Sequence, residues 1–309
     1  MSERTGDVLS PTEQSNPRTE SIDAVPTAEV LRMINTEDRR AVEAVAEVLP
    51  ELAAVVDLAA ERFRRGGTVH YFGAGTSGRL GVLDASELLP TYNLEPGRVV
   101  GHIAGGAEAL VNAVEDAEDS VVEGRRAAAG LGPDDVAIGL AASGGTPYVG
   151  GALQAARENG AHTVLVSSNP HAPLARHADT DIVLRTGPEA VTGSTRLKAG
   201  TAQKLVLNSF STALMIAVGR TWKNLMVSVV ATNAKLRERT VRILQEATDL
   251  EEDAARDLLD RTGGELKPAI VVALGGVGVD RAVAALAEGS GSVRAALAAL
   301  GAPAGGAAS

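Results

Sequence analysis

The chain has 309 residues and a formal net charge of −10, and it contains no cysteine. The absence of cysteine excludes disulfide bonds, thiolate zinc sites and a cysteine nucleophile. An acidic chain lacks the basic balance typical of proteins that bind nucleic acid or anionic membranes, so we expect neither as a partner. The first residues carry no apolar run of the kind found in secretion signals. The most apolar stretch, 213–218, is far shorter than the ~20 residues that span a bilayer. We therefore expect a cytoplasmic protein.

The N-terminal third predicts an arm followed by helices. Residues 1–25 are rich in Ser, Thr, Pro and Glu and show little hydrophobic periodicity, which predicts a disordered arm. Apolar residues then recur at helical spacing through 36–65. Pro50 is expected to divide this run into two helices.

Short apolar runs and helical segments alternate over the middle of the chain. Such alternation is typical of a parallel sheet that is covered by helices on both faces. The strand-like runs are 68–72, 98–104, 136–141, 163–166 and 181–184. The helical segments are 77–89, 107–129, 147–160, 172–178, 198–220 and 233–248. The fold class is therefore α/β, in a domain that extends over 26–250 and includes the N-terminal helices.

The strand pattern ends near residue 250. Three amphipathic segments follow at 251–261, 265–274 and 278–299, and Gly289-Ser290-Gly291 is expected to divide the last one. They predict a small helical C-terminal domain over 251–300, followed by a flexible Ala/Gly tail over 301–309.

A glycine-rich loop, Gly73–Gly78, follows the first predicted strand and matches the G-x-G-x-x-G pattern of dinucleotide-binding proteins. Those proteins place an acidic residue at the end of the second strand, to bind the ribose. The second strand here ends without one, which disfavours a nicotinamide enzyme. Gly75, Thr76 and Ser77 instead offer N–H groups and hydroxyls at a helix start, which suit a phosphate. The alternative is a tight turn in which Thr76 or Ser77 caps the helix.

Two further polar loops have the same character. One follows the third predicted strand, and the other precedes the long apolar helix that begins near residue 198. Loops at the same edge of a parallel sheet can hold one ligand between them, although the last loop is equally compatible with an ordinary helix N-terminus. The candidate binding residues of these two loops are Ser143, Gly144, Thr146, Ser194, Thr195 and Lys198.

Glu87 and Glu118 are candidate acid–base residues on predicted helices. Carboxylates on helices are usually solvated, and sequence spacing does not pair these two. The five histidines show no metal-ligand spacing and no G-x-S-x-G elbow is present, so neither a transition-metal site nor a hydrolase triad is expected.

The segment 72–87, FGAGTSGRLGVLDASE, resembles the signature of bacterial N-acetylmuramic acid 6-phosphate etherases. These enzymes belong to the sugar-isomerase (SIS) superfamily of phosphosugar-binding proteins. The resemblance extends over most of the chain, including the helical C-terminal segment. Further matching segments are 103–106, 117–120, 141–144 and 192–204.

The resemblance implies a SIS domain with a five-stranded parallel sheet, paired as a homodimer, and no cofactor. It also implies cleavage of the D-lactyl ether of N-acetylmuramic acid 6-phosphate, which yields N-acetylglucosamine 6-phosphate and D-lactate in the recycling of cell-wall sugars. The family's catalytic glutamates correspond to Glu87 and Glu118. By the resemblance Glu87 donates the proton to the leaving group, and we hypothesise that Glu118 is the base.

The sequence departs from the family pattern at two places. Gly145 stands where relatives commonly have Arg, and Leu88-Leu89 replace a usual Cys-Pro. The first difference removes a cation near the expected sugar site, but neither changes the glutamates or the loop hydroxyls. Two other functions remain open at this point: a non-catalytic sugar-phosphate-binding regulator like the glucokinase regulatory protein, and a phosphosugar isomerase.

Overall fold

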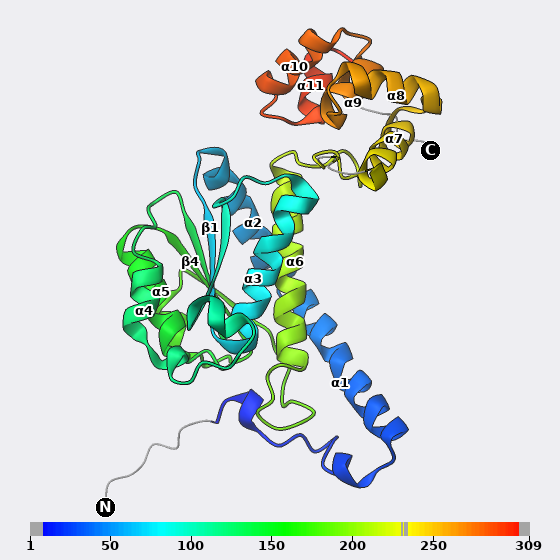
Figure 1. Cartoon of the computed structure of the whole chain (residues 1–309). Coiled ribbons are helices and arrows are strands. Elements are labelled where there is room, and N and C mark those ends of the chain that lie inside the picture. The colour runs from blue at the N-terminus through cyan, green and yellow to red at the C-terminus, as the bar shows by residue number, and fades with distance from the viewer. Residues whose placement is uncertain (1–8, 230, 232–233, 303–309) are drawn as a thin grey trace, which may run out of the picture. The chain divides into compact units, whose positions relative to one another are not determined.

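The computed structural model describes residues 9–229, 231 and 234–302 (Figure 1). The chain divides into two compact units. The first comprises Met1–Ser86 and Gly97–Ser211, and the second comprises Glu87–Pro96 and Thr212–Ser309.

A five-stranded sheet forms the centre of the first unit, in the order β2-β1-β3-β4-β5, and every neighbouring pair is parallel. All five predicted strands are confirmed, with boundaries that differ by no more than one residue. Every residue of the central strand β3 is buried, as expected where helices cover both faces. The strands are β1 (Val69–Gly73), β2 (Val99–Ile103), β3 (Val136–Leu140), β4 (His162–Ser167) and β5 (Thr180–Val183).

Helices α4 and α5 lie on one side of the sheet, and α3 and α6 lie on the other (Figure 1). Glycines let α4 and α5 approach closely: a Cβ added at Gly124 would lie 1.9 Å from the carbonyl oxygen of Tyr148. Pro50 stands in the first turn of α2 and separates it from α1, as predicted. The helices that begin in this unit are α1 (Thr27–Glu47), α2 (Leu49–Arg64), α3 (Gly75–Tyr92), α4 (Val121–Ala127), α5 (Pro147–Glu158) and α6 (Lys198–Ala217).

The predicted helix over 107–129 is wrong. The structure has two 3₁₀ turns there, η3 (Gly106–Leu110) and η4 (Ala117–Asp119), followed by the short helix α4. Asp116 has a φ of 59°, a left-handed conformation that interrupts a right-handed helix. Ser120 then starts α4 by accepting a hydrogen bond from the N–H of Glu123. The segment predicted at 172–178 is also a 3₁₀ turn, η5 (Pro173–His177).

Residues 9–25 differ from the disordered arm that their composition predicts. They contain the 3₁₀ turns η1 (Pro11–Glu13) and η2 (Ile22–Ala24), and Asn16 is buried. The Asn16 side chain donates hydrogen bonds to Glu37 on α1 and to the carbonyl of Pro188. Polar side chains hold this segment, and hydrophobic periodicity does not report such contacts. Residues 1–8 lie outside the described residues.

The second unit contains a bundle of short helices around a core of Leu, Ile, Val and Ala side chains. The C-terminal helices are confirmed, including the division at 289–291, where Ser290 and Gly291 have positive φ. Helix α7 belongs to this unit, whereas the sequence grouped it with the preceding domain. Residues 303–309 of the expected tail are not among the described residues. The helices are α7 (Ala234–Thr248), α8 (Glu252–Arg261), α9 (Leu266–Gly275), α10 (Val279–Glu288) and α11 (Val293–Ala299).

No single helix in the described ranges is long and apolar enough to cross a membrane. Helices α9 and α10 reach that length and hydropathy only when taken together, and they are bent by 107° at their junction.

Candidate active site

The strand order places two of the predicted loops side by side. β1 lies between β2 and β3, and the chain leaves β1 and β3 toward opposite edges of the sheet. In open parallel sheets, ligands bind in the crevice at the carboxyl ends of such a pair of strands. Gly73, which begins the first loop, is the register partner of Leu140 at the end of β3. The two sequence-predicted loops that follow β1 and β3 therefore leave the sheet from adjacent positions.

The first loop opens helix α3 and lies against the start of α6. Gly75 has a φ of 51°, a conformation that glycine adopts without strain. The Ser77 hydroxyl donates to Oε1 of Gln203 on α6 at 2.8 Å. A Cβ built at Gly200, also on α6, would lie 3.5 Å from Cγ2 of Thr76. Thr76 and Ser77 thus face the polar start of α6 across the loop.

Gln203 is a site candidate that the sequence analysis missed. Its side chain is buried, and its Nε2 has no hydrogen-bond partner among the described residues. A buried donor without an acceptor is unusual and is typical of a place where a ligand or an ordered water completes the bonding. Gln203 lies in the segment 192–204 that resembles the etherase pattern. The sequence analysis considered polar residues in loops, whereas Gln203 lies inside an apolar helix.

The second loop presents a hydroxyl that the fold leaves free. Thr146 is the N-cap residue of α5, but its side chain makes no capping hydrogen bond. Gly144 has a φ of 70°, and a Cβ there would lie 2.3 Å from the Cβ of Ala172, so only glycine fits. The Asn169 side chain donates to the carbonyl of Ser143 at 2.9 Å and fixes the loop. The start of α5 can therefore receive an anion on its N–H groups and on the Thr146 hydroxyl.

Lys198, in the third loop, is held by the protein's own carboxylates. Its side chain is fully buried, and its ammonium group pairs with Glu37 on α1. Arg18 binds the same carboxylate, and its hydrogen bond is the largest cause that lowers the pKa of Glu37 to about 2. Glu189 accepts hydrogen bonds from the backbone N–H groups of Lys198 and Ala199 at the start of α6. The sequence predicted that Lys198 contacts an anionic ligand, whereas its ammonium group here contacts Glu37. Ser194 and Thr195 of the same loop are partly exposed.

Glu118 lies in the same cavity as the first loop. It is exposed on η4, and a cavity of about 250 Å³ is lined by Glu118, Gly75 and Arg79 among others. The Arg79 guanidinium donates to the carbonyls of Leu110 and Asn112 and thereby holds the segment that follows η3. The structure therefore brings a carboxylate from η4 to the phosphate-type loop, although sequence spacing did not connect them.

Glu87 lies further along α3 and is exposed. At 1.5 Å of rise per residue, about 18 Å of helix separate it from Gly75. One turn earlier, Asp84 is buried and accepts hydrogen bonds from Tyr71 on β1 and from Asn208 and Ser211 on α6. Burial raises the pKa of Asp84. This cluster fixes the rotation of α3, which carries Glu87.

The fold and its glycine-rich crevice define a SIS-type domain, and two family comparisons agree. The glucokinase regulatory protein N-terminal SIS domain matches residues 51–157, and the SIS domain matches residues 110–213. Among solved structures, a phosphoheptose isomerase from Francisella tularensis is 17% identical, with a TM-score of 0.48. That match covers 62% of this chain and 98% of the isomerase.

Curated relatives identify the family within this class. The N-acetylmuramic acid 6-phosphate etherase of Thermobifida fusca is 56% identical, over 86% of this chain and 88% of the relative. The corresponding etherase of Pectobacterium atrosepticum is 50% identical, over 92% of this chain and 95% of the relative. The chain belongs to the N-acetylmuramic acid 6-phosphate etherase family.

The buried pair of Glu37 and Lys198 gives a prediction about stability. Glu37→Gln leaves the buried ammonium without a carboxylate and should lower the free energy of unfolding by about 3 kcal/mol at pH 7. The folded pKa of Glu37 lies below its ordinary value of 4.5, so its contribution is fully present above the unfolded pKa and is lost as the pH falls toward 2. Urea unfolding of the variant and the wild type across this range measures the difference.

Glu43→Gln, an exposed change on the same helix, serves as the control and should alter stability little at any pH. A Glu37→Gln deficit that stays constant from pH 7 down to pH 2 would contradict the account of the pair.

Proposed function

We propose that this chain cleaves the D-lactyl ether of N-acetylmuramic acid 6-phosphate to give N-acetylglucosamine 6-phosphate and D-lactate. The observation that carries the proposal is the position of Glu118, which shares a cavity with the first phosphate-type loop. The identity of 56% to a curated etherase supports the substrate.

The proposed phosphate site is built from neutral donors. The N–H groups at the starts of α3 and α5 face the carboxyl ends of β1 and β3, and the hydroxyls of Thr76 and Thr146 stand at these helix starts. Ser77, whose hydroxyl donates to Gln203, contributes its backbone N–H. The free Nε2 of Gln203 adds a donor next to Ser77. Helix starts and hydroxyls bind phosphate without a large positive charge. Ser143, Gly144, Ser194 and Thr195 complete the proposed sugar-phosphate site from the neighbouring loops.

The reaction requires an acid and a base. Opening of the sugar ring gives an aldehyde, which acidifies the proton on carbon 2. In our proposal Glu118 removes that proton, and Glu87 protonates the ether oxygen on carbon 3 as the bond to lactate breaks. Water then adds to the resulting carbon–carbon double bond at carbon 3 and restores the hydroxyl. Each assisted proton transfer typically contributes ~10²–10⁴-fold to the rate, and none of these steps requires a cofactor.

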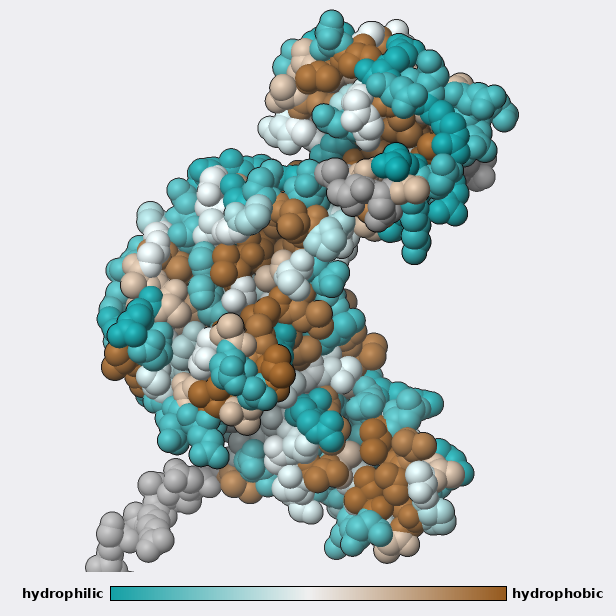
Figure 2. Space-filling model, viewed as in Figure 1, coloured by the Kyte–Doolittle hydropathy of each residue, from teal (hydrophilic) through white to brown (hydrophobic). Residues whose placement is uncertain are grey.

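We further propose that the chain works as a homodimer in the cytoplasm. Helix α1 exposes Leu31 and Val42, each more than 60% accessible, and Figure 2 shows hydrophobic residues gathered on the surface over this helix. Exposed apolar patches often mark contacts between chains. In this proposed dimer, one site takes Glu118 from one chain and Glu87 from the other.

The activity is tested by D-lactate release from N-acetylmuramic acid 6-phosphate. Glu118→Gln should lower kcat by about 10²–10⁴-fold, because it removes the base, while the Kd for the phosphosugar changes little. Glu51→Gln, an exposed change on α2, serves as the control and should keep wild-type turnover.

The other outcomes of this assay correspond to the remaining functions. Binding by the wild type without lactate release would favour a sugar-phosphate-binding regulator. Conversion of a phosphosugar between aldose and ketose without lactate release would favour an isomerase. Either result would refute the proposed etherase activity.

The shared site is tested by mixing two inactive variants. Glu87→Gln and Glu118→Gln each inactivate their own homodimers. If each site takes one glutamate from each chain, random reassembly leaves about a quarter of all sites intact. D-lactate release by the refolded mixture should therefore recover to about a quarter of the wild-type rate. An inactive mixture that contains heterodimers would place both glutamates of a site on one chain.

A further inference from the structure

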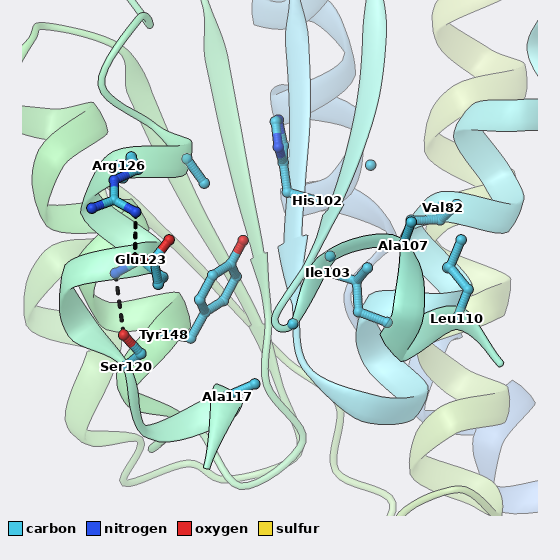
Figure 3. A pocket seen from close by; sticks show the side chains of 14 residues that line it. Val82, His102, Ile103, Ala107, Leu110, Ala117, Ser120, Glu123, Arg126 and Tyr148 are labelled. Carbon is cyan, nitrogen blue, oxygen red and sulfur yellow. Dashed lines mark hydrogen bonds and ion pairs between the residues drawn. The ribbon is translucent and has the colours of Figure 1, made fainter. Parts of the chain in front are cut away.

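A second, larger cavity lies beside the edge strand β2, on the side of the sheet that α4 and α5 cover. Its volume is about 770 Å³. Figure 3 shows the side chains that line it. Of the residues that line the Glu118 cavity, only Ala117 also lines this one. Its walls are largely apolar, which suits a small organic ligand. The apolar side chains are Val82, Ile103, Ala107, Leu110, Ala117 and Ala127.

A chain of hydrogen bonds leads from a carboxylate to this cavity. The Thr68 hydroxyl donates to Oδ1 of Asp135 at 2.7 Å and lies 2.9 Å from Nε2 of His70. Nδ1 of His70 lies 2.8 Å from Nε2 of His102. His102 stacks on Phe72, with ring centroids 4.6 Å apart, and lines the cavity. The proposed reaction uses none of these residues.

The ionised carboxylate of Asp135 fixes the position of every proton along this series of hydrogen bonds. The pKa of Asp135 is lowered, so the group is ionised and only accepts. Thr68 has one hydroxyl proton and gives it to Asp135, so it accepts from Nε2–H of His70. Burial lowers the pKa of both histidines, that of His102 to about 4, so each ring carries one proton at neutral pH. Nδ1 of His70 therefore accepts from Nε2–H of His102, and Nδ1 of His102 keeps a free lone pair.

Tyr148 supplies a donor to the same cavity. The residue is only 4% exposed, and Figure 3 shows its hydroxyl directed into the space between α4 and His102. The hydroxyl forms no hydrogen bond with any described residue. Burial raises the pKa of Tyr148 to about 12, so the proton is retained at neutral pH. Because this hydroxyl lines the cavity and has no partner among the described residues, it is available to bind a ligand or water there.

The charged groups of the cavity compensate each other. Arg126 donates to Glu123 at 2.6 Å, and both side chains are more than half exposed at the rim. No other acidic or basic residue apart from His102 lines the cavity within the described part of the chain. The interior therefore presents the lone pair of His102 and the hydroxyls of Tyr148 and Ser120 without net charge.

We propose that this cavity binds a small neutral molecule that carries a carboxamide. The amide N–H donates to Nδ1 of His102, and the amide carbonyl accepts from the Tyr148 hydroxyl. The apolar remainder of the ligand fills the cavity between η3 and α4. A carboxylate cannot donate a hydrogen bond to Nδ1 of His102, and it would lose its solvation without gaining a counter-ion. An ammonium group cannot accept a hydrogen bond from the Tyr148 hydroxyl.

The ligand class is tested with benzamide, benzoate and benzylamine, which have similar size and differ in the polar group. Titration of the full chain at pH 7, followed by saturation-transfer NMR, should show benzamide bound at least ~10-fold more tightly than either charged probe. Tyr148→Phe and His102→Leu should each weaken benzamide roughly three- to tenfold, the effect of one lost hydrogen bond. Tyr92→Phe, a Tyr-to-Phe change elsewhere in the chain, should leave the affinity unchanged.

The proton arrangement is tested separately on the wild-type chain, by long-range ¹H–¹⁵N correlation of the histidine rings. The expected result is an unprotonated Nδ1 on His102 and a protonated Nε2 on both His70 and His102. A protonated Nδ1 on His102, equal affinity for benzamide and benzoate, or no binding of benzamide would each overturn the proposal.

Discussion

Five register pairs join β1 to β3, from Val69 opposite Val136 to Gly73 opposite Leu140. The arrangement of the crevice depends on this pairing, because it brings two loops that are far apart in sequence to one edge of the sheet. Each loop opens a helix, and each carries a glycine with positive φ. The binding groups of the crevice are therefore largely backbone N–H groups and hydroxyls whose positions follow from strand pairing.

The third loop is held in another way. Glu37 compensates the buried Lys198, and Glu189 caps the start of α6. Burial of a charge is costly unless it is paired and hydrogen-bonded, so these residues constrain where α6 begins. That position in turn sets Gln203 beside Ser77. The net charge of −10 does not oppose phosphate binding here, since neutral donors at helix starts form the proposed site.

The sequence predicted the sheet well and the connections less well. Buried parallel strands are continuous apolar runs, so all five were found. The prediction of a helix over 107–129 was wrong because Asp116 adopts a left-handed conformation that interrupts it. The amino-acid composition of the segment does not indicate that conformation. Residues 9–25 have the composition of a disordered arm, yet Asn16 and its hydrogen bonds to distant residues order them. These outcomes were decided by contacts across the fold, which a local pattern does not contain.

For the candidate site, too, the sequence predicted local features but not the contacts between distant segments. The glycine and hydroxyl pattern located the loops after β1 and β3, and the resemblance to the etherases identified the glutamates. Neither source connected Glu118 with the first loop or found the free amide of Gln203, because both depend on how separate segments fold together. Lys198 was expected as a loop cation, and only its buried partner Glu37 explains why a lysine stands there.

The central claim is that a carboxylate beside a phosphate-type loop drives elimination of lactate from an opened sugar. The most direct measurement is the reaction of the wild-type chain with N-acetylmuramic acid 6-phosphate in deuterium oxide, with the product analysed by NMR and mass spectrometry. The account predicts release of D-lactate together with N-acetylglucosamine 6-phosphate that carries solvent deuterium on carbon 2. Lactate release that leaves carbon 2 free of deuterium would contradict it and would favour direct displacement.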